Sequence, residues 1–170
     1  MRITMTNASA IDPDVRKKVL RSLTYGLHVL TAIADGEVAA GTVTWLSQAS
    51  FNPPLVMVGV KADSRLHAVV ERAGAFAVNV VDGEHAAVAA AFFRPTQVVG
   101  DRINGFAFEP GPQTQAPLLV DLPLWFEAKV VDSIKRGDHT VFVAELLAGG
   151  VRDEAAEPLA LRSTAWSYGG

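Results

Sequence analysis

The chain has 170 residues, a length typical of one domain, and its 15 Lys and Arg against 18 Asp and Glu give a net charge of −3. This balance excludes an obvious electrostatic surface for nucleic acid. Hydrophobic residues make up 49% of the sequence and charged residues 19%, which excludes a disordered chain. The absence of cysteine excludes disulfides, thiolate metal sites and thiol catalysis, and it fits a reducing compartment.

No apolar run reaches the roughly 18 residues that a membrane helix needs. The segment Met1–Asp14 also lacks the apolar region of a signal peptide. We therefore predict a cytoplasmic globular protein that forms a single domain over residues 1–170. We expect neither nucleic acid nor a membrane among its partners.

The first elements are a helix and a hairpin. Asp12 and Pro13 are typical of a helix start, and apolar residues at helical spacing follow them, with basic residues on a solvated face. This pattern predicts a helix over about 13–24. Asp35-Gly36, flanked by β-branched residues, is typical of a hairpin turn between antiparallel strands. The two expected strands are 27–34 and 38–46.

A strand and a helix are expected next. Pro53-Pro54 forces an extended start to residues 55–61, whose apolar side chains predict a strand buried on both faces. Ser64 as a cap and Gly74 as a stop bound a short helix over 65–73. The later elements are a strand over 76–81, an Ala-rich helix over 84–93, and strands over 124–134, 140–147 and 159–168.

The segment 94–124 has no clear period and contains five prolines. Such a segment inside a domain is usually functional or packs on a partner. The remaining pattern gives about seven strands, mostly antiparallel neighbours, and three short helices. It predicts a mainly β fold with short helices, in which an antiparallel, Greek-key-like barrel removes the sheet edges. A Rossmann domain is not indicated, because the glycine-rich nucleotide fingerprint is absent.

The four histidines do not show the paired helical spacing of a zinc site. His28 lies in an apolar strand and is expected in the core or an interface. His67 and His85 lie on predicted surface helices and are expected to be solvated. His139 follows a Gly-Asp turn, where its ring can face a ligand or donate a hydrogen bond; ordinary turn polarity is the alternative.

A stretch rich in hydroxyl groups covers the end of the second strand. Thr42 and Thr44 are expected on one strand face, with Val43 and Trp45 on the other. Threonine favours strands in any case. The irregular run predicted over 47–52, however, leaves backbone groups free to bind a planar polar ligand.

Lys61, Ser64 and Arg65 are candidates for an anion site. Ser64 is the predicted cap of a helix whose free N–H groups attract anions, and the two basic residues lie beside it. Many helix caps bind nothing, which is the alternative. A hydrolase is not indicated, because the sequence has no Gly-x-Ser-x-Gly motif and no distinctive pair of carboxylates.

These pieces resemble the flavin reductase-like family of FMN-binding split barrels. The resemblance covers about residues 15–168, and the Ser-Phe-x-Pro-Pro and Gly-Asp-His elements in this order form its most specific part. The matching segments are 26–31, 41–54, 76–80, 116–119 and 137–143.

The resemblance implies a homodimer of split barrels with flavin near the subunit interface. It implies an NAD(P)H-dependent flavin reductase that transfers hydride to FMN, or to FAD, and supplies reduced flavin to a partner monooxygenase. A positioned flavin needs no acid–base pair in the protein, which fits this sequence. Two alternatives stay open: an FMN-bound electron carrier without free-flavin turnover, and a relative that binds no flavin or another planar cofactor. NADH and NADPH are not distinguished.

The resemblance also assigns roles to residues. The segment Thr42–Thr44 is expected beside the flavin ring, Ser47–Phe51 along the ring edge and ribityl chain, and Lys61, Ser64 and Arg65 near the phosphate. His139 is the expected catalytic residue. Trp45 departs from the smaller residue common at its position. The cofactor-binding set is Thr42, Val43, Thr44, Trp45, Ser47, Gln48, Ala49, Ser50, Phe51, Lys61, Ser64, Arg65, Asn79, Gly137 and Asp138, with no metal ligand.

Overall fold

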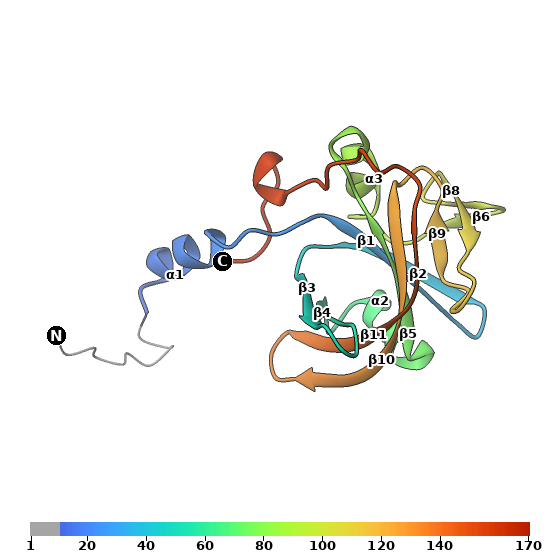
Figure 1. Cartoon of the computed structure of the whole chain (residues 1–170). Coiled ribbons are helices and arrows are strands. Elements are labelled where there is room, and N and C mark those ends of the chain that lie inside the picture. The colour runs from blue at the N-terminus through green and yellow to red at the C-terminus, as the bar shows by residue number, and fades with distance from the viewer. Residues whose placement is uncertain (1–10) are drawn as a thin grey trace.

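The computed structural model describes residues 11–170 (Figure 1). Most of the segment in which no signal peptide is predicted therefore lies outside the described residues. The helices are α1 (Pro13–Arg21), α2 (Arg65–Ala73) and α3 (Ala86–Ala91), with short 3-10 helices η2 (Gly83–His85) and η3 (Leu161–Ser163). Within residues 11–170, every helix falls short of the length and apolar character that a membrane crossing requires.

The strands form two antiparallel sheets, so the prediction of a mainly β fold with short helices is confirmed. The larger sheet has the order β2-β1-β5-β10-β11-β4-β3, and the smaller has the order β6-β7-β8-β9. The strands are β1 (His28–Ala34), β2 (Glu37–Val43), β3 (Leu46–Ser50), β4 (Leu55–Lys61), β5 (Ala75–Val80), β6 (Val98–Val99), β7 (Arg102–Ile103), β8 (Phe106–Pro110), β9 (Pro117–Leu119), β10 (Leu124–Lys135) and β11 (His139–Val151).

The larger sheet curls but does not close, which is consistent with a split barrel (Figure 1). Its two edge strands, β2 and β3, are separated in the chain only by Thr44 and Trp45. The Gly59 N–H donates to the Trp45 carbonyl at 2.8 Å, so this short link leads the chain from β2 into β3 alongside β4. β2 and β4 consequently lie on either side of an opening without pairing with each other.

Helix α2 fills one end of the barrel. Its predicted boundaries are confirmed: the Ser64 hydroxyl accepts from the His67 N–H, and Gly74 ends the helix in a left-handed conformation with φ of 61°. Leu66 and Val69 of this helix belong to the same buried cluster as Phe76 of β5. Because α2 begins beside the end of β4, its free N–H groups face the opening.

Three strand predictions near the opening are wrong. The second strand ends at Val43, and most of the run over 47–52 is regular, because Ser47–Ser50 belongs to β3 and pairs with β4, whereas Phe51 and Asn52 form a turn. β4 is buried on one face only; Val58 is buried, whereas Met57 next to it is 42% exposed. An exposed edge strand carries polar residues without alternation, which is why its sequence resembles a loop.

Two further segments differ from the prediction. Residues 94–124 contain the four short strands of the smaller sheet, and these have only two to five residues each, too few to show a period. Residues 159–168 do not form a strand; they make one isolated bridge at Ala160 and the short helix η3. This C-terminal segment instead runs back across the opening.

Two histidines were expected in the wrong environment. His67 is buried rather than solvated, because its Nε2 lies 2.7 Å from the Thr140 hydroxyl of β11. His85 is partly buried, and its Nδ1 lies 2.6 Å from the Asp82 carboxylate. His28 follows the prediction, since burial lowers its pKa to about 4.

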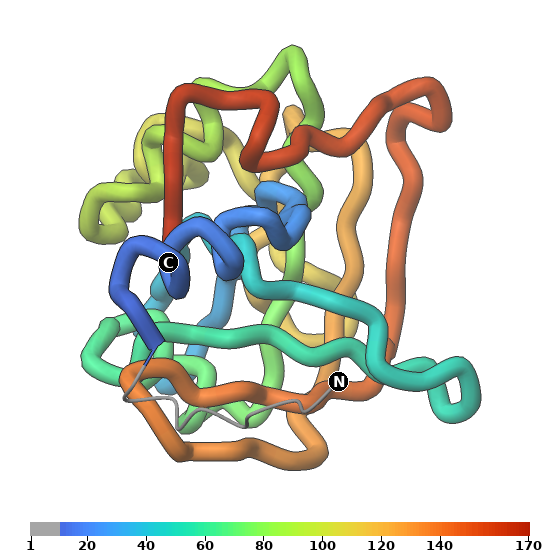
Figure 2. Tube along the Cα trace, turned by 90° about the vertical axis from the view of Figure 1, so that its left-hand side faces the viewer, coloured from blue at the N-terminus to red at the C-terminus, as the bar shows by residue number. Residues whose placement is uncertain are grey.

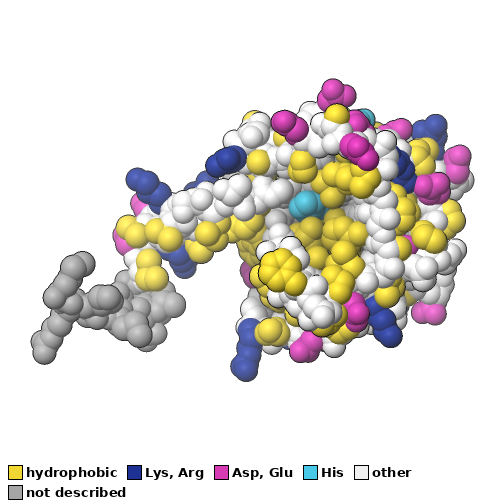
Figure 3. Space-filling view, viewed as in Figure 1, with side chains coloured by type: hydrophobic (Ala, Val, Ile, Leu, Met, Phe, Trp, Pro, Cys, Tyr) yellow, Lys and Arg dark blue, Asp and Glu magenta, His cyan; other side chains and the backbone are white. Residues whose placement is uncertain are grey.

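Helix α1 extends away from the barrel and contains no buried residue (Figure 1). Its start is as predicted, since the Asp12 carboxylate accepts from the N–H groups of Asp14 and Val15. Val19 is 60% exposed, and Figure 3 shows further apolar side chains along the same arm. Figures 1 and 2 both place the C-terminus beside α1, where Arg21 Nε donates to the Gly169 carbonyl at 3.2 Å.

Candidate functional site

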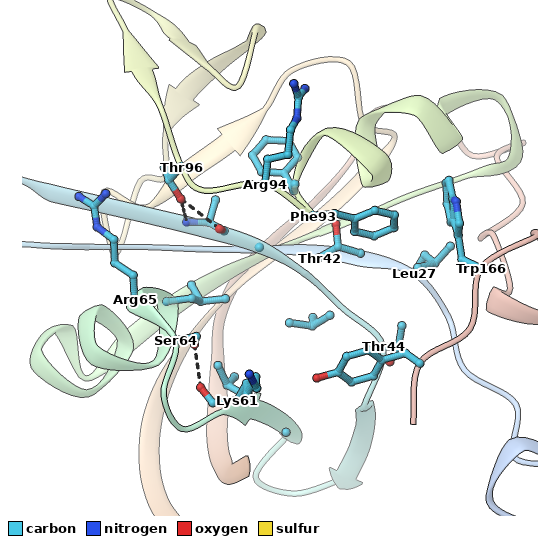
Figure 4. Close-up of a pocket in the computed structure, with 18 of the residues that line it drawn as sticks. Leu27, Thr42, Thr44, Lys61, Ser64, Arg65, Phe93, Arg94, Thr96 and Trp166 are labelled. Carbon is cyan, nitrogen blue, oxygen red and sulfur yellow. Dashed lines mark hydrogen bonds between the residues drawn. The ribbon is translucent and has the colours of Figure 1, made fainter. Parts of the chain in front are cut away.

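A pocket of about 700 Å³ lies in the opening between β2 and β4. Residues 40–44 form one wall, and residues 59–61 with the start of α2 form another. Residues 92–96 after α3 and residues 166–168 of the C-terminal tail complete the lining (Figure 4). The split in the barrel therefore creates the pocket, because paired strands would leave no space there.

Thr42 and Thr44 both line this pocket, as the sequence predicts for a ligand beside this strand. The Thr42 hydroxyl donates to the Ala89 carbonyl at 2.7 Å. The Thr44 hydroxyl is buried and has no hydrogen-bond partner among the described residues. An unpaired buried hydroxyl costs about 1–3 kcal/mol. A polar ligand in the pocket would recover this energy by bonding to Thr44.

The three residues of the predicted anion site also meet at the pocket. The Ser64 hydroxyl caps α2 and donates to the Lys61 carbonyl at 2.7 Å. Lys61 Nζ lies 3.2 Å from the Asp63 carboxylate, and Arg65 Nε donates to Glu37 at 2.8 Å. Figure 4 shows Ser64 and Lys61 across the pocket from Thr42. The N-terminus of α2 and the long cationic side chains of Lys61 and Arg65 can therefore bind a phosphate at this wall.

His139 lies beside the pocket but does not line it. Its Nδ1 is 2.8 Å from the Asp138 carboxylate and its Nε2 is 2.7 Å from the Tyr168 hydroxyl. The hydrogen bond from His139 lowers the pKa of Asp138. The indole of Trp45 packs 4.5 Å from the His139 ring, so the open face expected for this histidine is covered by the protein itself.

Most of the chain matches a known protein family. A family model described as "Flavin reductase like domain" matches residues 20–166. The chain belongs to this flavin reductase-like family. A flavin reductase (NADH) of Kitasatospora aureofaciens is 35% identical over 88% of this chain and 78% of its own length. The NADH-dependent flavin reductase StyB of Pseudomonas fluorescens is 33% identical over 88% of this chain and 85% of its own.

A solved structure supports the same membership. The styrene monooxygenase flavin reductase (SMOB) of Pseudomonas putida S12 superposes with a TM-score of 0.70 at 28% identity. The superposition covers 86% of this chain and 91% of that chain. The resemblance found in the sequence is therefore confirmed.

The chemistry of the pocket in this flavin reductase-like chain fits a flavin. A flavin nucleotide presents a planar ring with a polar edge and a phosphate. The pocket offers the unpaired hydroxyl of Thr44 on one wall and the N-terminus of α2 on another. Apolar side chains such as Phe93 and Trp166 line a further side of the pocket (Figure 4). Among the described residues, no group of three or more potential metal ligands is present.

Several predicted residues lie outside this pocket. Asn79 is fully buried, and its side chain bonds to the Val29 carbonyl at 3.2 Å and to the Leu119 N–H at 2.8 Å, so it links strands instead of binding a ligand. Gly137 lies in an exposed turn. The other residues outside the lining are Trp45, Ser47, Gln48, Ala49, Ser50, Phe51, Asp138 and His139.

The Ser47–Phe51 segment is the largest disagreement with the predicted site. Its residues lie on the outer edge of the sheet, and Phe51 is 91% exposed. Only the first part of the hydroxyl-rich stretch, Thr42 to Thr44, faces the pocket of this chain. The segment can therefore contact a ligand only if that ligand extends beyond the pocket or lies between two copies.

Sequence reasoning missed two parts of the pocket. One is Phe92–Thr96 after α3, and the other is Trp166–Tyr168 in the tail. The first had a signal in the sequence, because residues 94–124 are expected either to be functional or to pack on a partner. The second had none, because the tail sequence resembles a strand and reaches the pocket only through the folded structure.

Proposed function

We propose that this protein is an NADH-dependent flavin reductase that binds FMN or FAD in the pocket between β2 and β4. The observation that carries the proposal is the pocket itself, with the unpaired Thr44 hydroxyl, in a chain of the flavin reductase-like family. The related reductases named above use NADH, which favours NADH over NADPH. An electron carrier without turnover is not favoured, because the two relatives named above are named as NADH-dependent reductases.

The residues act mainly by binding and orienting. Thr44 and the backbone of β2 hold the polar edge of the ring, and the free N–H groups at the N-terminus of α2, which Ser64 caps, hold the phosphate. Lys61 and Arg65 add positive charge beside that phosphate. Bound flavin supplies the hydride acceptor. The buried side chains of Leu27 and Phe92 form an apolar inner wall of the pocket. Direct hydride transfer to a positioned flavin needs no general acid or base from the protein.

The direct test is oxidation of NADH by the purified protein with FMN, FAD or riboflavin. We expect turnover with NADH, and no flavin-dependent oxidation of NADH would contradict the proposal. Thr44→Val makes the test specific. It should weaken flavin binding about tenfold, because the ligand loses one buried hydrogen bond.

The same Thr44→Val variant should unfold at the same or a slightly higher denaturant concentration, because the lost hydroxyl has no partner in the protein. Thr44→Ser keeps the hydroxyl and should restore most of the affinity. Flavin titrations followed by fluorescence, and urea unfolding without flavin, measure the two effects. Unchanged flavin affinity in Thr44→Val would show that this hydroxyl does not bind the ligand.

We also propose that the protein is a homodimer and that α1 is part of its interface. All of α1 is exposed, although Val15 and Val19 lie one turn apart along it and Leu23 follows its end. An unpartnered amphipathic helix favours association. The mass in solution measured by light scattering should be twice that of the chain, and Val19→Glu should lower it toward 18.1 kDa. A monomeric wild-type protein would contradict this.

A two-component system is the proposed context. The relative from Pseudomonas putida S12 is a styrene monooxygenase flavin reductase. By analogy, this protein would deliver reduced flavin to a partner monooxygenase in the cytoplasm. A reductase that releases its product flavin needs a pocket open to solvent, and the exposed rim residues Phe93 and Tyr168 are consistent with this.

A further inference from the structure

Tyr168 is the polar residue that the C-terminal tail brings to the pocket. It lines the pocket next to Trp166, and 44% of its surface is exposed at the rim. Its hydroxyl lies 2.7 Å from His139 Nε2. A residue near the end of the chain is therefore connected directly to the Gly-Asp-His turn between β10 and β11.

The two hydrogen bonds of His139 determine which group is the donor between Tyr168 and His139. A carboxylate only accepts, so the Nδ1 that faces Asp138 carries the proton. In the neutral ring, Nε2 is then the acceptor, and the Tyr168 hydroxyl donates to it. Both ring nitrogens of His139 are occupied, which leaves this histidine no polar atom for a ligand. The lone pairs of the Tyr168 oxygen remain available to a ligand donor.

The surroundings hold the tyrosine in place. The Trp45 ring packs 5.2 Å from Tyr168 and 4.5 Å from His139. Gly169 has a positive φ of 81°, and a Cβ there would lie 2.9 Å from the Trp45 ring, so the tail fits closely against the indole. The Gly169 carbonyl is also bonded to Arg21 of α1. The tail is therefore held against Trp45 and α1 at Tyr168 and at the residue that follows it.

From this arrangement we infer that Tyr168, and not His139, is the side chain that contacts the nicotinamide of NADH. The inference rests on the proposed function. The carboxamide of nicotinamide carries an NH2 donor, which matches the free lone pairs of the Tyr168 oxygen. Tyr168 lies at the exposed rim, where a second substrate enters after the flavin. Asp138 and His139 are positioning residues: Asp138 orients His139, and His139 orients the Tyr168 hydroxyl.

The test compares Tyr168→Phe, His139→Gln and the double variant by steady-state oxidation of NADH at saturating flavin. Tyr168→Phe should raise KM for NADH about fivefold, with kcat and the flavin dissociation constant within about twofold of wild type. His139→Gln should change KM in the same direction. The double variant should match Tyr168→Phe, because His139 acts through the hydroxyl that this variant lacks.

Arg162→Ala is the matched control, since this exposed tail residue does not line the pocket. It should behave as wild type, and equal unfolding temperatures would show that all variants fold. Unchanged KM in Tyr168→Phe overturns the inference. So does a His139→Gln effect that multiplies with Tyr168→Phe, because His139 would then contact the substrate itself. Wild-type protein that does not oxidise NADH overturns the proposed function, and this inference with it.

Discussion

Glu127→Ala should lower the free energy of unfolding by about 3 kcal/mol or more, although Glu127 does not line the pocket. Glu127 is fully buried on β10. Its carboxyl group accepts from the Thr114 N–H at 2.7 Å, from the Thr114 hydroxyl at 2.6 Å and from the Gln113 N–H at 3.1 Å. Alanine leaves these donors unpaired beside a cavity.

The backbone around Glu127 is shaped for its carboxyl group. A Cβ at Gly111 would overlap it, so this loop needs glycine at that position. Glu127→Gln keeps the side-chain length and one oxygen, and should cost less than alanine. Glu154→Ala, at an exposed position in the loop after β11, should stay within about 0.5 kcal/mol of wild type.

Urea unfolding at pH 7 measures all three variants. The folded fraction of Glu127→Ala should keep the KM values of wild type, because none of the donors lines the pocket. A loss of stability no larger than that of Glu154→Ala would show that the loop finds other acceptors for its N–H groups. A selective loss of flavin affinity would instead connect this loop to the site.

Local signals predicted the parts of the fold that short stretches of sequence determine. Ser64 and Gly74 fix both ends of α2, and Asp35-Gly36 turns β1 into β2 with positive φ at both residues. The same local signals located Lys61, Ser64 and Arg65 at the pocket. These residues are adjacent in the chain, so no long-range contact is needed to bring them together.

The rest of the site depends on contacts between distant segments. His67 looks solvated in its own helix, and only the approach of Thr140 from β11 buries it and supplies its hydrogen bond. Tyr168 reaches His139 only because the tail returns across the barrel. No periodicity within either segment indicates these pairs. The resemblance correctly predicted the family. Its association of the Gly-Asp-His turn with nicotinamide and flavin placement stays a prediction, and in this chain Trp45 and Tyr168 both contact His139.

The split barrel also explains why half of the hydroxyl-rich stretch misses the pocket. The chain leaves β2 at Val43 and, after only Thr44 and Trp45, enters β3, which pairs with β4. This short link keeps Thr42 and Thr44 at the opening and carries Ser47–Ser50 to the outer edge of the sheet. In the proposed homodimer, that edge and the exposed Phe51 are available to a second subunit, so the predicted ring-edge contacts can still form between subunits.

The pH dependence of stability should contain a distinct contribution from His28. Burial lowers the pKa of His28 to about 4, against an ordinary value of about 6.5. Its Nδ1 has no partner among the described residues, and its ring packs against the Gly26 backbone, so a charged imidazolium is not stabilised there. The folded protein therefore keeps this side chain neutral at pH values where the unfolded chain binds a proton.

This difference in proton binding determines how the free energy of unfolding changes with pH. Above about pH 6.5 His28 is neutral in both states, and stability is at its full value. As the pH falls from 6.5 to 4, the unfolded state takes up a proton that the folded state does not, so the free energy of unfolding should fall by up to about 3 kcal/mol. Hydrogen bonds to Arg65 and Lys135 lower the pKa of Glu37 and Glu71, and these carboxylates lose their contribution only in more acidic solution.

His28→Gln separates the contribution of His28 from that of Glu37 and Glu71, because glutamine does not titrate. Urea unfolding of both proteins at several pH values between 4 and 8 measures this. Below pH 6.5 the free energy of unfolding should fall more steeply with decreasing pH for wild type than for the variant. Above that pH the two curves should run parallel. Equal slopes throughout would mean that the folded protein accommodates the charged histidine, either by admitting water to β1 or by moving the ring away from the core.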